Sequence, residues 1–248
     1  MRPRPSLARW ALGAAVLLAV GARPAAADQL VDLELVLAGD ASGSIDNTEM
    51  QMQRRGYAAA ITDPQVLEAI ALGQVGAIAV AYIEWAGSFS VDTVVDWTVI
   101  RDRASAEAFA ETLQAAPRRA EGYNSIGAAI RYARNLIDGN RYEGLRRVID
   151  IAADGPDIGA PKAAVARDEA VTEDITVNGL VIESAFYTDF MSPIPLPQHF
   201  AEQVIGGPGA FVTIAHGMED FRDVLLAKLV REISDRDHPR PQLAEHRP

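Results

Sequence analysis

The sequence predicts an α/β fold with a doubly wound, mostly parallel sheet that is flanked by helices. Three observations lead to this prediction. Strand-like apolar runs alternate along the chain with segments of helical periodicity. The run GAIAVAYI at 76–83 is apolar on both faces, as a central strand covered by helices requires. The clearest helical segment, which starts near Ser125, repeats apolar residues at i, i+3 and i+4.

The elements follow one another in this alternating order. The expected elements are a strand at 31–38, helices at 47–61 and 64–70, a strand at 76–83, a turn at 84–87, an edge strand at 91–97, helices at 105–115 and 125–138, a strand at 147–152, a helix at 161–172, a strand at 175–182, an irregular excursion at 183–198, a strand at 210–214 and a helix at 218–233. Pro64 at a first helical position and Gly139 after a last turn support two of the helix boundaries. Three prolines between 193 and 197 argue against regular structure in the excursion.

The N-terminus reads as a secretory signal peptide. Arginines precede an apolar run at 10–20, and Ala25-Ala26-Ala27 supplies the small residues of a cleavage site. The run holds about 11 residues, whereas a membrane-spanning helix needs about 20, although a membrane anchor stays an alternative. We expect residues 1–27 to be a signal peptide, residues 28–234 to form one domain, and residues 235–248 to be a disordered tail. The protein is therefore predicted to be exported, to the periplasm or the cell exterior.

Composition narrows the possible functions. The net charge is −11, and removal of residues 1–27 with their four arginines would bring it to about −15. Such acidity argues against nucleic acid and anionic lipid as partners and suits cations or basic partners. The sequence contains no cysteine, which excludes thiol nucleophiles, cysteine-bound zinc and redox motifs.

Polar oxygen-bearing side chains gather where the first predicted strand ends. The run LELVLAGDASGS places Asp40, Ser42 and Ser44 at two-residue spacing. One carboxylate and two hydroxyls are ligands that a hard cation such as Mg²⁺ accepts, but they make an incomplete site. Further ligands would have to come from later loops.

Two later loops offer such ligands. Asn124, or Ser125 beside it, precedes the clearest helix, and Asp154 follows the strand at 147–152. In open α/β sheets the ligand site lies outside the carboxyl ends of the strands, where the strand order reverses. We therefore expect the loops at Asp40, Asn124 and Asp154 to meet at one edge of the sheet.

The order and spacing of these loops resemble the metal-ion-dependent adhesion site of von Willebrand factor A-type domains. More narrowly, VDLELVLAGDASGSID, EWAG, RRVIDIAADG and VIGGPGAF resemble an uncharacterised bacterial family of exported A-domain-like proteins, a domain of unknown function. The chain departs from the pattern at Asn124, where the family has threonine, and at Ala152, where S-G-D-G is usual.

The resemblance implies a function in binding rather than catalysis. It implies a site for Mg²⁺, or for Mn²⁺ or Ca²⁺, formed by Asp40, Ser42, Ser44, Asn124 and Asp154. It also implies a protein partner, unidentified, whose acidic side chain would complete the metal shell. We expect no enzymatic activity, no nucleic-acid partner and no membrane span after signal cleavage.

Two alternatives remain open. The first is a metal-free interaction or scaffold domain whose site has degenerated, as Asn124 and Ala152 suggest. The second is a Mg²⁺-dependent phosphatase of the haloacid-dehalogenase type, with Asp40 as nucleophile and Asp154 and Asp157 as acids. That class usually has its general acid where this chain has Ser42, and its lysine has no obvious counterpart.

Overall fold

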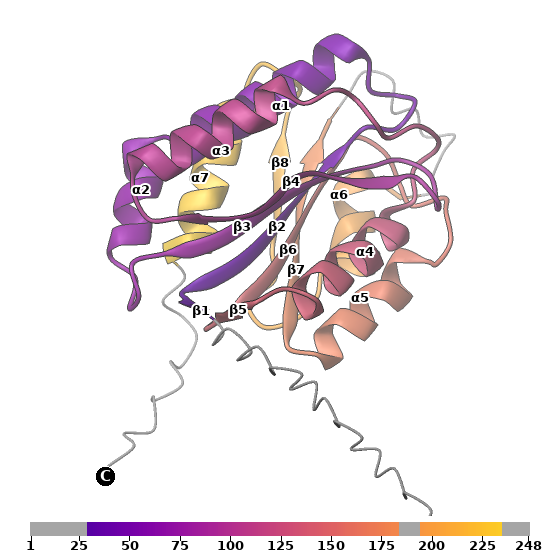
Figure 1. The fold of residues 1–248 in the computed structure, drawn as a ribbon. Coiled ribbons are helices and arrows are strands. Elements are labelled where there is room, and N and C mark those ends of the chain that lie inside the picture. Colours follow the sequence, from indigo (N-terminus) through magenta and orange to yellow (C-terminus); the bar gives the residue numbers. More distant parts are fainter. Residues whose placement is uncertain (1–28, 184–193, 235–248) are drawn as a thin grey trace, which may run out of the picture.

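A six-stranded sheet lies at the centre of the computed structural model, which describes residues 29–183 and 194–234 (Figure 1). The strands are β1 (Gln29–Val31), β2 (Leu33–Asp40), β3 (Ile78–Trp85), β4 (Val91–Ile100), β5 (Tyr142–Gly144), β6 (Arg147–Ala153), β7 (Ile175–Ile182) and β8 (Val212–Ala215). The main sheet has the order β4-β3-β2-β6-β7-β8, and every neighbouring pair is parallel except β3 with β4. The predicted fold class is therefore confirmed.

Helices cover both faces of this sheet. They are α1 (Asn47–Ile61), α2 (Pro64–Ala71), α3 (Arg103–Ala115), α4 (Ile126–Asp138), α5 (Ala163–Thr172), α6 (Leu196–His199), the π-helical turn η1 (Phe200–Val204) and α7 (Phe221–Ser234). One face packs against α1, α2, α3 and α7, and the other against α4, α5, α6 and η1 (Figure 1). No helix in the described part of the chain is both long and apolar enough to cross a membrane.

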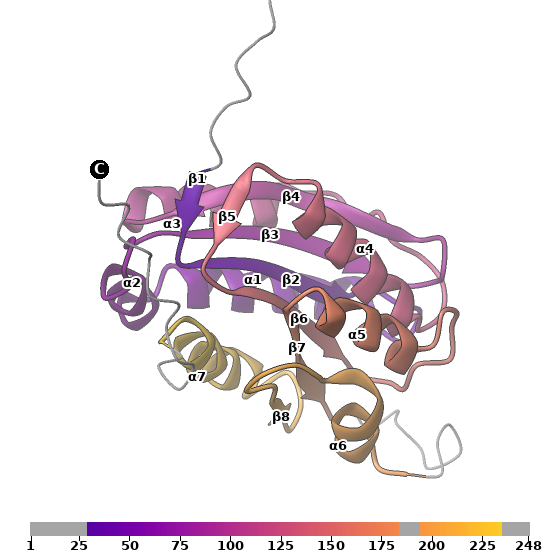
Figure 2. The ribbon, with the colours of Figure 1, turned by 90° about the horizontal axis from the view of Figure 1, so that it is seen from below.

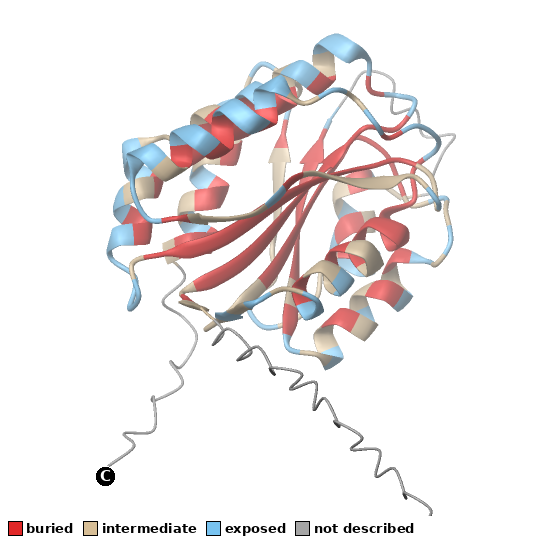
Figure 3. Cartoon of the chain, in the orientation of Figure 1, coloured by how far each residue is buried: buried red, intermediate tan, exposed pale blue. Residues whose placement is uncertain are grey.

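The two cores follow from the alternation of side chains along each strand. In β2, Leu33, Leu35 and Leu37 belong to the core under α1 and α7, while Val36 and Ala38 belong to the core under α4. Every residue of β2 and β3 is buried, and Figure 3 shows burial along the central strands with exposure on the outer helix surfaces. The expectation that 76–83 is a strand covered on both faces is borne out.

The strand order reverses between β2 and β6. From β2 the chain moves outward to β3 and β4, and α4 then returns it to β6 on the other side of β2. Loops that follow β2 and β6 therefore diverge in opposite directions and leave space between them, which is where open α/β sheets bind ligands. Asp40 is the last residue of β2, and Asp154 follows the last residue of β6.

The structure differs from some of the local predictions. Strand β3 continues through Trp85, which pairs with Val91, so the turn begins at Ala86 rather than at 84. Strand β5 was not expected; it is short and pairs in parallel with β1 to form a separate two-stranded sheet (Figure 2). Its pairing partner lies more than 100 residues away, so local periodicity could not reveal it.

The excursion expected at 183–198 also needs correction, because helix α6 begins within it at Leu196. Proline is tolerated in the first turn of a helix, where the missing N–H would have no partner, so Pro197 does not prevent this helix. Leu196, Phe200 and Val204 then bury one side of α6 and η1. The rest of the excursion at 184–193, the predicted signal peptide at 1–27 and the predicted tail at 235–248 lie outside the described residues.

Candidate metal centre

The first loop of the candidate site begins at the buried end of β2. Asp40 is 1% exposed, and its Oδ1 accepts a hydrogen bond from Ser42 N at 2.8 Å. The hydroxyls of Ser42 and Ser44 lie 3.0 Å apart. Ser42 is buried and Ser44 is exposed, so the loop leads from the protein interior to solvent.

The start of α1 limits the length of this loop. Asp46 caps the helix by accepting hydrogen bonds from Thr48 N at 2.6 Å and Glu49 N at 2.9 Å, and the Glu49 side chain accepts from Asp46 N. This capping box satisfies N–H groups that the first helical turn leaves unpaired. Only residues 41–45 therefore connect the strand to the helix cap, in agreement with the helix predicted at 47–61.

The third loop comes directly against the first. Ser44 donates its hydroxyl hydrogen to Asp154 Oδ1 at 2.8 Å, and Asp154 N lies 3.5 Å from Asp40 Oδ2. This proximity follows from the parallel pairing of β2 with β6, in which Ala38 lies opposite Ile151. Four of the candidate side chains thus form one cluster, that of Asp40, Ser42, Ser44 and Asp154.

The second loop contributes Asn124 rather than Ser125 to this region. The Asn124 side chain lies against the residue that follows Asp154, since a Cβ added to Gly155 would be 2.2 Å from Asn124 Nδ2. The Ser125 hydroxyl is fully buried and turns elsewhere, 3.1 Å from Ser88 Oγ. Of the two second-loop side chains that the sequence suggested, only that of Asn124 lies against the residue after Asp154, with its amide nitrogen nearest to Gly155.

Burial shapes the electrostatics of the two carboxyl groups. Burial, together with the negative charge of Asp154, raises the pKa of the Asp40 carboxyl to about 7. Burial also raises the pKa of Asp154, which the hydrogen bond from Ser44 partly opposes. Because the two carboxyl groups are in contact and partly desolvated, ionisation of both is unfavourable. A cation between them would lower this free-energy cost.

Arg118 is a contributor that the sequence reasoning missed. Its guanidinium donates to Ala41 O at 2.7 Å, to Ser42 O at 3.3 Å and to Ile45 O at 3.0 Å. These bonds hold three backbone carbonyls of the first loop. No local pattern could have identified this arginine, because more than 70 residues separate it from the loop.

The donor set fits a hard divalent cation. It offers two carboxylates, two hydroxyls and one amide oxygen, which are the ligand types that Mg²⁺, Mn²⁺ and Ca²⁺ accept. In the part of the chain that the structure describes, no three His, Cys, Asp or Glu side chains lie close enough together to hold a metal alone. An ion here would therefore depend on the serine hydroxyls and the asparagine as well as on the two aspartates.

The residues of the phosphatase alternative are arranged differently from that expectation. Asp157 accepts hydrogen bonds from Ala163 N at 3.0 Å and Gly127 N at 3.4 Å, so its carboxylate holds the first turns of α5 and α4. Lys228 is fully buried and pairs with Asp150 at 2.6 Å and Glu232 at 2.5 Å under α7. Neither group is oriented toward the Asp40 cluster by these contacts.

Comparison with known proteins places the chain in a family. Residues 30–237 match the family described as protein of unknown function (DUF1194). The chain belongs to DUF1194. A search of curated proteins found no match to it.

Solved structures similar to this DUF1194 protein include a pilus adhesin and a von Willebrand factor type A protein. A pilus adhesin, SpaC from Lactobacillus rhamnosus GG, has a TM-score of 0.61 and 13% identity over 84% of this chain and 31% of its own. A von Willebrand factor type A protein from Catenulispora acidiphila has a TM-score of 0.54 and 14% identity over 82% of this chain and 43% of its own.

A third similar structure is proximal thread matrix protein 1 from the mussel byssus, described with zinc in its MIDAS motif. Its TM-score is 0.58, with 16% identity over 84% of the DUF1194 chain and 49% of its own. The DUF1194 chain thus spans half or less of the length of each of these proteins. At these identities the likeness establishes a von Willebrand A-like fold, as the sequence resemblance predicted.

Proposed function

We propose that this DUF1194 protein is an exported protein-binding domain that holds a divalent cation at a site of the adhesion type. The observation that carries the proposal is that three loops converge where the strand order of the sheet reverses. There the Asp40, Ser42, Ser44 and Asp154 side chains form one hydrogen-bonded cluster, with Asn124 beside it. All five residues carry oxygen ligands suited to Mg²⁺, or to Mn²⁺ or Ca²⁺.

The proposed roles follow from the position of each side chain. Ser42, Ser44 and Asn124 would bind the cation directly, and Asp40 and Asp154 would act largely through bound water. A shell rich in neutral ligands leaves net positive charge on the ion when it is bound. That charge favours an acidic side chain of a partner protein, which is the kind of partner we propose.

The similar structures support a role in protein contact. They include a pilus adhesin and a matrix protein, and one of them is described with zinc in its MIDAS motif. These descriptions belong to those proteins, and their application to this chain is part of the proposal. Export is proposed on the sequence of residues 1–27, with residues 28–234 as the binding domain and residues 235–248 as a disordered tail.

The test is calorimetric titration of the purified protein with Mg²⁺, Mn²⁺ and Ca²⁺. Asp40→Ala and Asp154→Ala are titrated in parallel, and circular dichroism confirms that each variant is folded. We expect saturable binding that both substitutions abolish. No binding at millimolar cation to a folded wild-type protein would contradict the proposal.

A metal-free interaction domain is the second candidate, and two observations favour it. Asn124 stands where the family pattern has threonine, and the hydroxyl of Ser44 already has a protein acceptor in Asp154. If this candidate is correct, partner binding persists in the presence of a chelator. If the wild-type protein hydrolyses an aryl phosphate and Asp40→Asn does not, the phosphatase alternative is supported instead.

A further inference from the structure

Large apolar side chains lie exposed on three loops beside the candidate cation site. Phe89, Tyr123 and Ile158 expose 104%, 80% and 46% of their surfaces. The loops are in contact, since Ile158 N donates to Asn124 O at 3.0 Å and a Cβ on Gly87 would lie 3.8 Å from Tyr123 N. Single exposed apolar residues are common on soluble proteins, but three around one site indicate a contact surface.

A pocket of about 640 Å³ opens beside the same loops. Phe89, Val91, Tyr132 and Pro161 provide apolar walls. Ser88 also lines the pocket, and its hydroxyl lies 3.1 Å from that of Ser125, which follows Asn124 in the chain but turns away from the Asp40 cluster. The volume is within the range of about 300–1,000 Å³ that is typical of ligand pockets.

Hydrogen bonding and close packing hold these walls in place. The Tyr132 hydroxyl lies 3.0 Å from Thr93 Oγ1, which fixes the ring between α4 and β4. Helix α4 approaches the loop at Pro161 so closely that a Cβ on Gly127 would lie 2.0 Å from Pro161 O. A pocket with fixed walls loses less entropy when it is filled.

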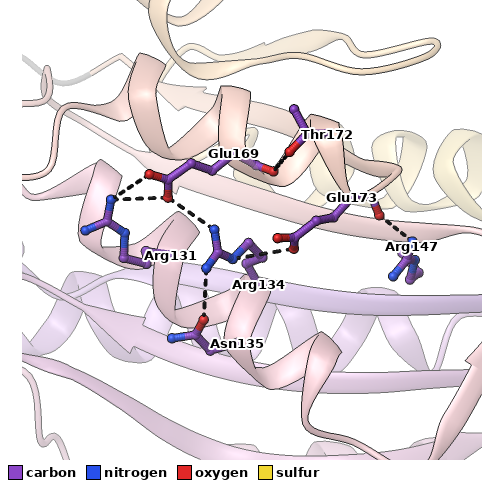
Figure 4. Close-up of polar contacts among 7 residues, drawn as sticks. All are labelled: Arg131, Arg134, Asn135, Arg147, Glu169, Thr172 and Glu173. Atoms are coloured by element: carbon purple, nitrogen blue, oxygen red, sulfur yellow. Dashed lines mark hydrogen bonds and ion pairs between the residues drawn. The ribbon is translucent and has the colours of Figure 1, made fainter.

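Among the described residues that line this pocket, Arg131 is the only charged one, although the chain as a whole is strongly acidic. Its Nη2 contacts the two carboxylate oxygens of Glu169 at 3.0 and 3.2 Å, and Arg134 contacts the same carboxylate at 3.1 Å (Figure 4). Within the described residues, Arg131 Nε and Nη1 have no hydrogen-bond partner, and the side chain is 41% exposed. Beside its ion pair with Glu169, Arg131 therefore keeps N–H donors that an incoming acidic group could use.

We propose that the pocket receives a bulky apolar side chain from an acidic segment of the partner protein. The apolar walls select the side chain, and Arg131 favours acidic residues near it. The acidic surface of the whole chain does not prevent this contact, because charges more than about 8 Å away are largely screened at physiological salt. The inference rests on the proposed function, since the same segment would present its acidic residue to the cation.

The test uses fluorescent nonapeptides and the purified protein, with binding measured by fluorescence anisotropy in Mg²⁺ and in a chelator. Each probe peptide carries one Asp and one Phe, two to four positions apart, in a Gly-Ser background. Matched peptides replace Asp by Asn or Phe by Ala. The protein variants are Phe89→Ser and Arg131→Gln, both at exposed side chains, and Leu72→Ser, which removes an exposed apolar side chain away from the site.

We expect at least one spacing to bind about tenfold more tightly than both of its matched peptides. Phe89→Ser and Arg131→Gln should each weaken this binding several-fold, and Leu72→Ser should leave it unchanged. Failure of all peptides to bind at millimolar concentration would overturn the inference. So would equally tight binding of free N-acetyl-phenylalanine amide, which would indicate a small-molecule pocket.

The experiment separates this inference from the proposed function. Binding that needs Mg²⁺ and Asp40 but is indifferent to the Phe of the peptide and to Phe89 would refute the pocket and support the cation site. Binding that needs both phenylalanines but is equal in chelator would support the pocket and contradict the cation bridge.

Discussion

Ser44 donates a hydrogen bond of 2.8 Å to Asp154, although 110 residues separate them in the sequence. The bond joins the loop after β2 to the residue after β6, across the point where the strand order reverses. It brings a hydroxyl that is exposed to solvent against a carboxyl group that is almost completely buried. This single contact brings two of the three loops of the candidate cation site together.

Ser44→Ala should weaken cation binding about tenfold or more, because it removes a proposed ligand. It should also cost about 1 kcal/mol of unfolding free energy without cation, because Asp154 loses a hydrogen bond. Calorimetry and urea unfolding measure the two effects. Thr48→Ala, at an exposed side chain on α1, is the matched control. Unchanged cation affinity in Ser44→Ala would rule out a ligand role.

Gly155→Ala should lower cation affinity with little loss of stability. The added Cβ would lie 2.2 Å from Asn124 Nδ2, so the asparagine side chain must move away. The end of a side chain moves easily, whereas a displaced ligand no longer binds. Gly87→Ala is the control, because its Cβ would meet only ordinary contacts at 3.7 Å or more. Equal titration curves for the two variants would show that Asn124 does not bind the ion.

Arg118→Gln should loosen the first loop. The guanidinium holds three backbone carbonyls there, and its loss should cost about 1–2 kcal/mol of unfolding free energy. Cation affinity should fall about 10–100-fold, as is usual when a group that orients metal ligands is removed. Arg119→Gln, at the exposed neighbour, should change neither quantity. A cation affinity unaffected by Arg118→Gln would mean that the loop is positioned without it.

Glu84→Leu should destabilise the fold by about 3–5 kcal/mol, because it leaves the buried charge of Arg54 without its partner. The two side chains are 1% and 3% exposed and form an ion pair of 2.7 Å. The double variant with Arg54→Leu should lose less than the sum of the single losses. Arg55→Leu, at the exposed neighbour, should change stability by about 0.5 kcal/mol or less. Additive losses would show that the ion pair contributes no coupling.

Glu232→Gln should flatten the dependence of stability on pH. Burial, followed by the charge of Asp150, raises the pKa of Glu232 to about 7, against the opposing effects of Lys228 and Asn178. The folded state therefore retains a proton that the unfolded chain releases near its ordinary pKa of 4.5. Stability falls as pH rises through this window, because the folded state binds more protons there.

Urea unfolding between pH 4.5 and 7.5, in chelator, measures this effect. The unfolding free energy of the wild-type protein should fall with rising pH more steeply than that of Glu232→Gln, by on the order of 1 kcal/mol per pH unit. Asp40, whose pKa is also raised to about 7, contributes a slope of the same sign that both proteins retain. Parallel curves would show that Glu232 does not titrate in this range.

Local patterns in the sequence were enough for most of the architecture. The strand at 175–182 and the capped helix that ends at Ile61 follow from apolar periodicity and capping chemistry, which involve neighbours only a few residues apart. The same reasoning placed Asp40 and Asp154 after strands. Their meeting at one edge followed from the rule that the carboxyl ends of parallel strands share an edge.

Contacts between distant segments were decided only by the tertiary structure. The sequence favoured Asn124 as the second-loop ligand with Ser125 beside it as a further hydroxyl, and packing turned the serine toward Ser88. Helical spacing alone places Arg54 on an otherwise apolar helix face, and the fold supplied Glu84 as its buried partner. Arg118 gave no signal, because its role arises when the sheet brings its loop to the carbonyls after β2. Periodicity in the sequence indicates which face of a helix or strand a residue lies on. The partner that it meets on that face is determined by strand order and by packing across the whole chain.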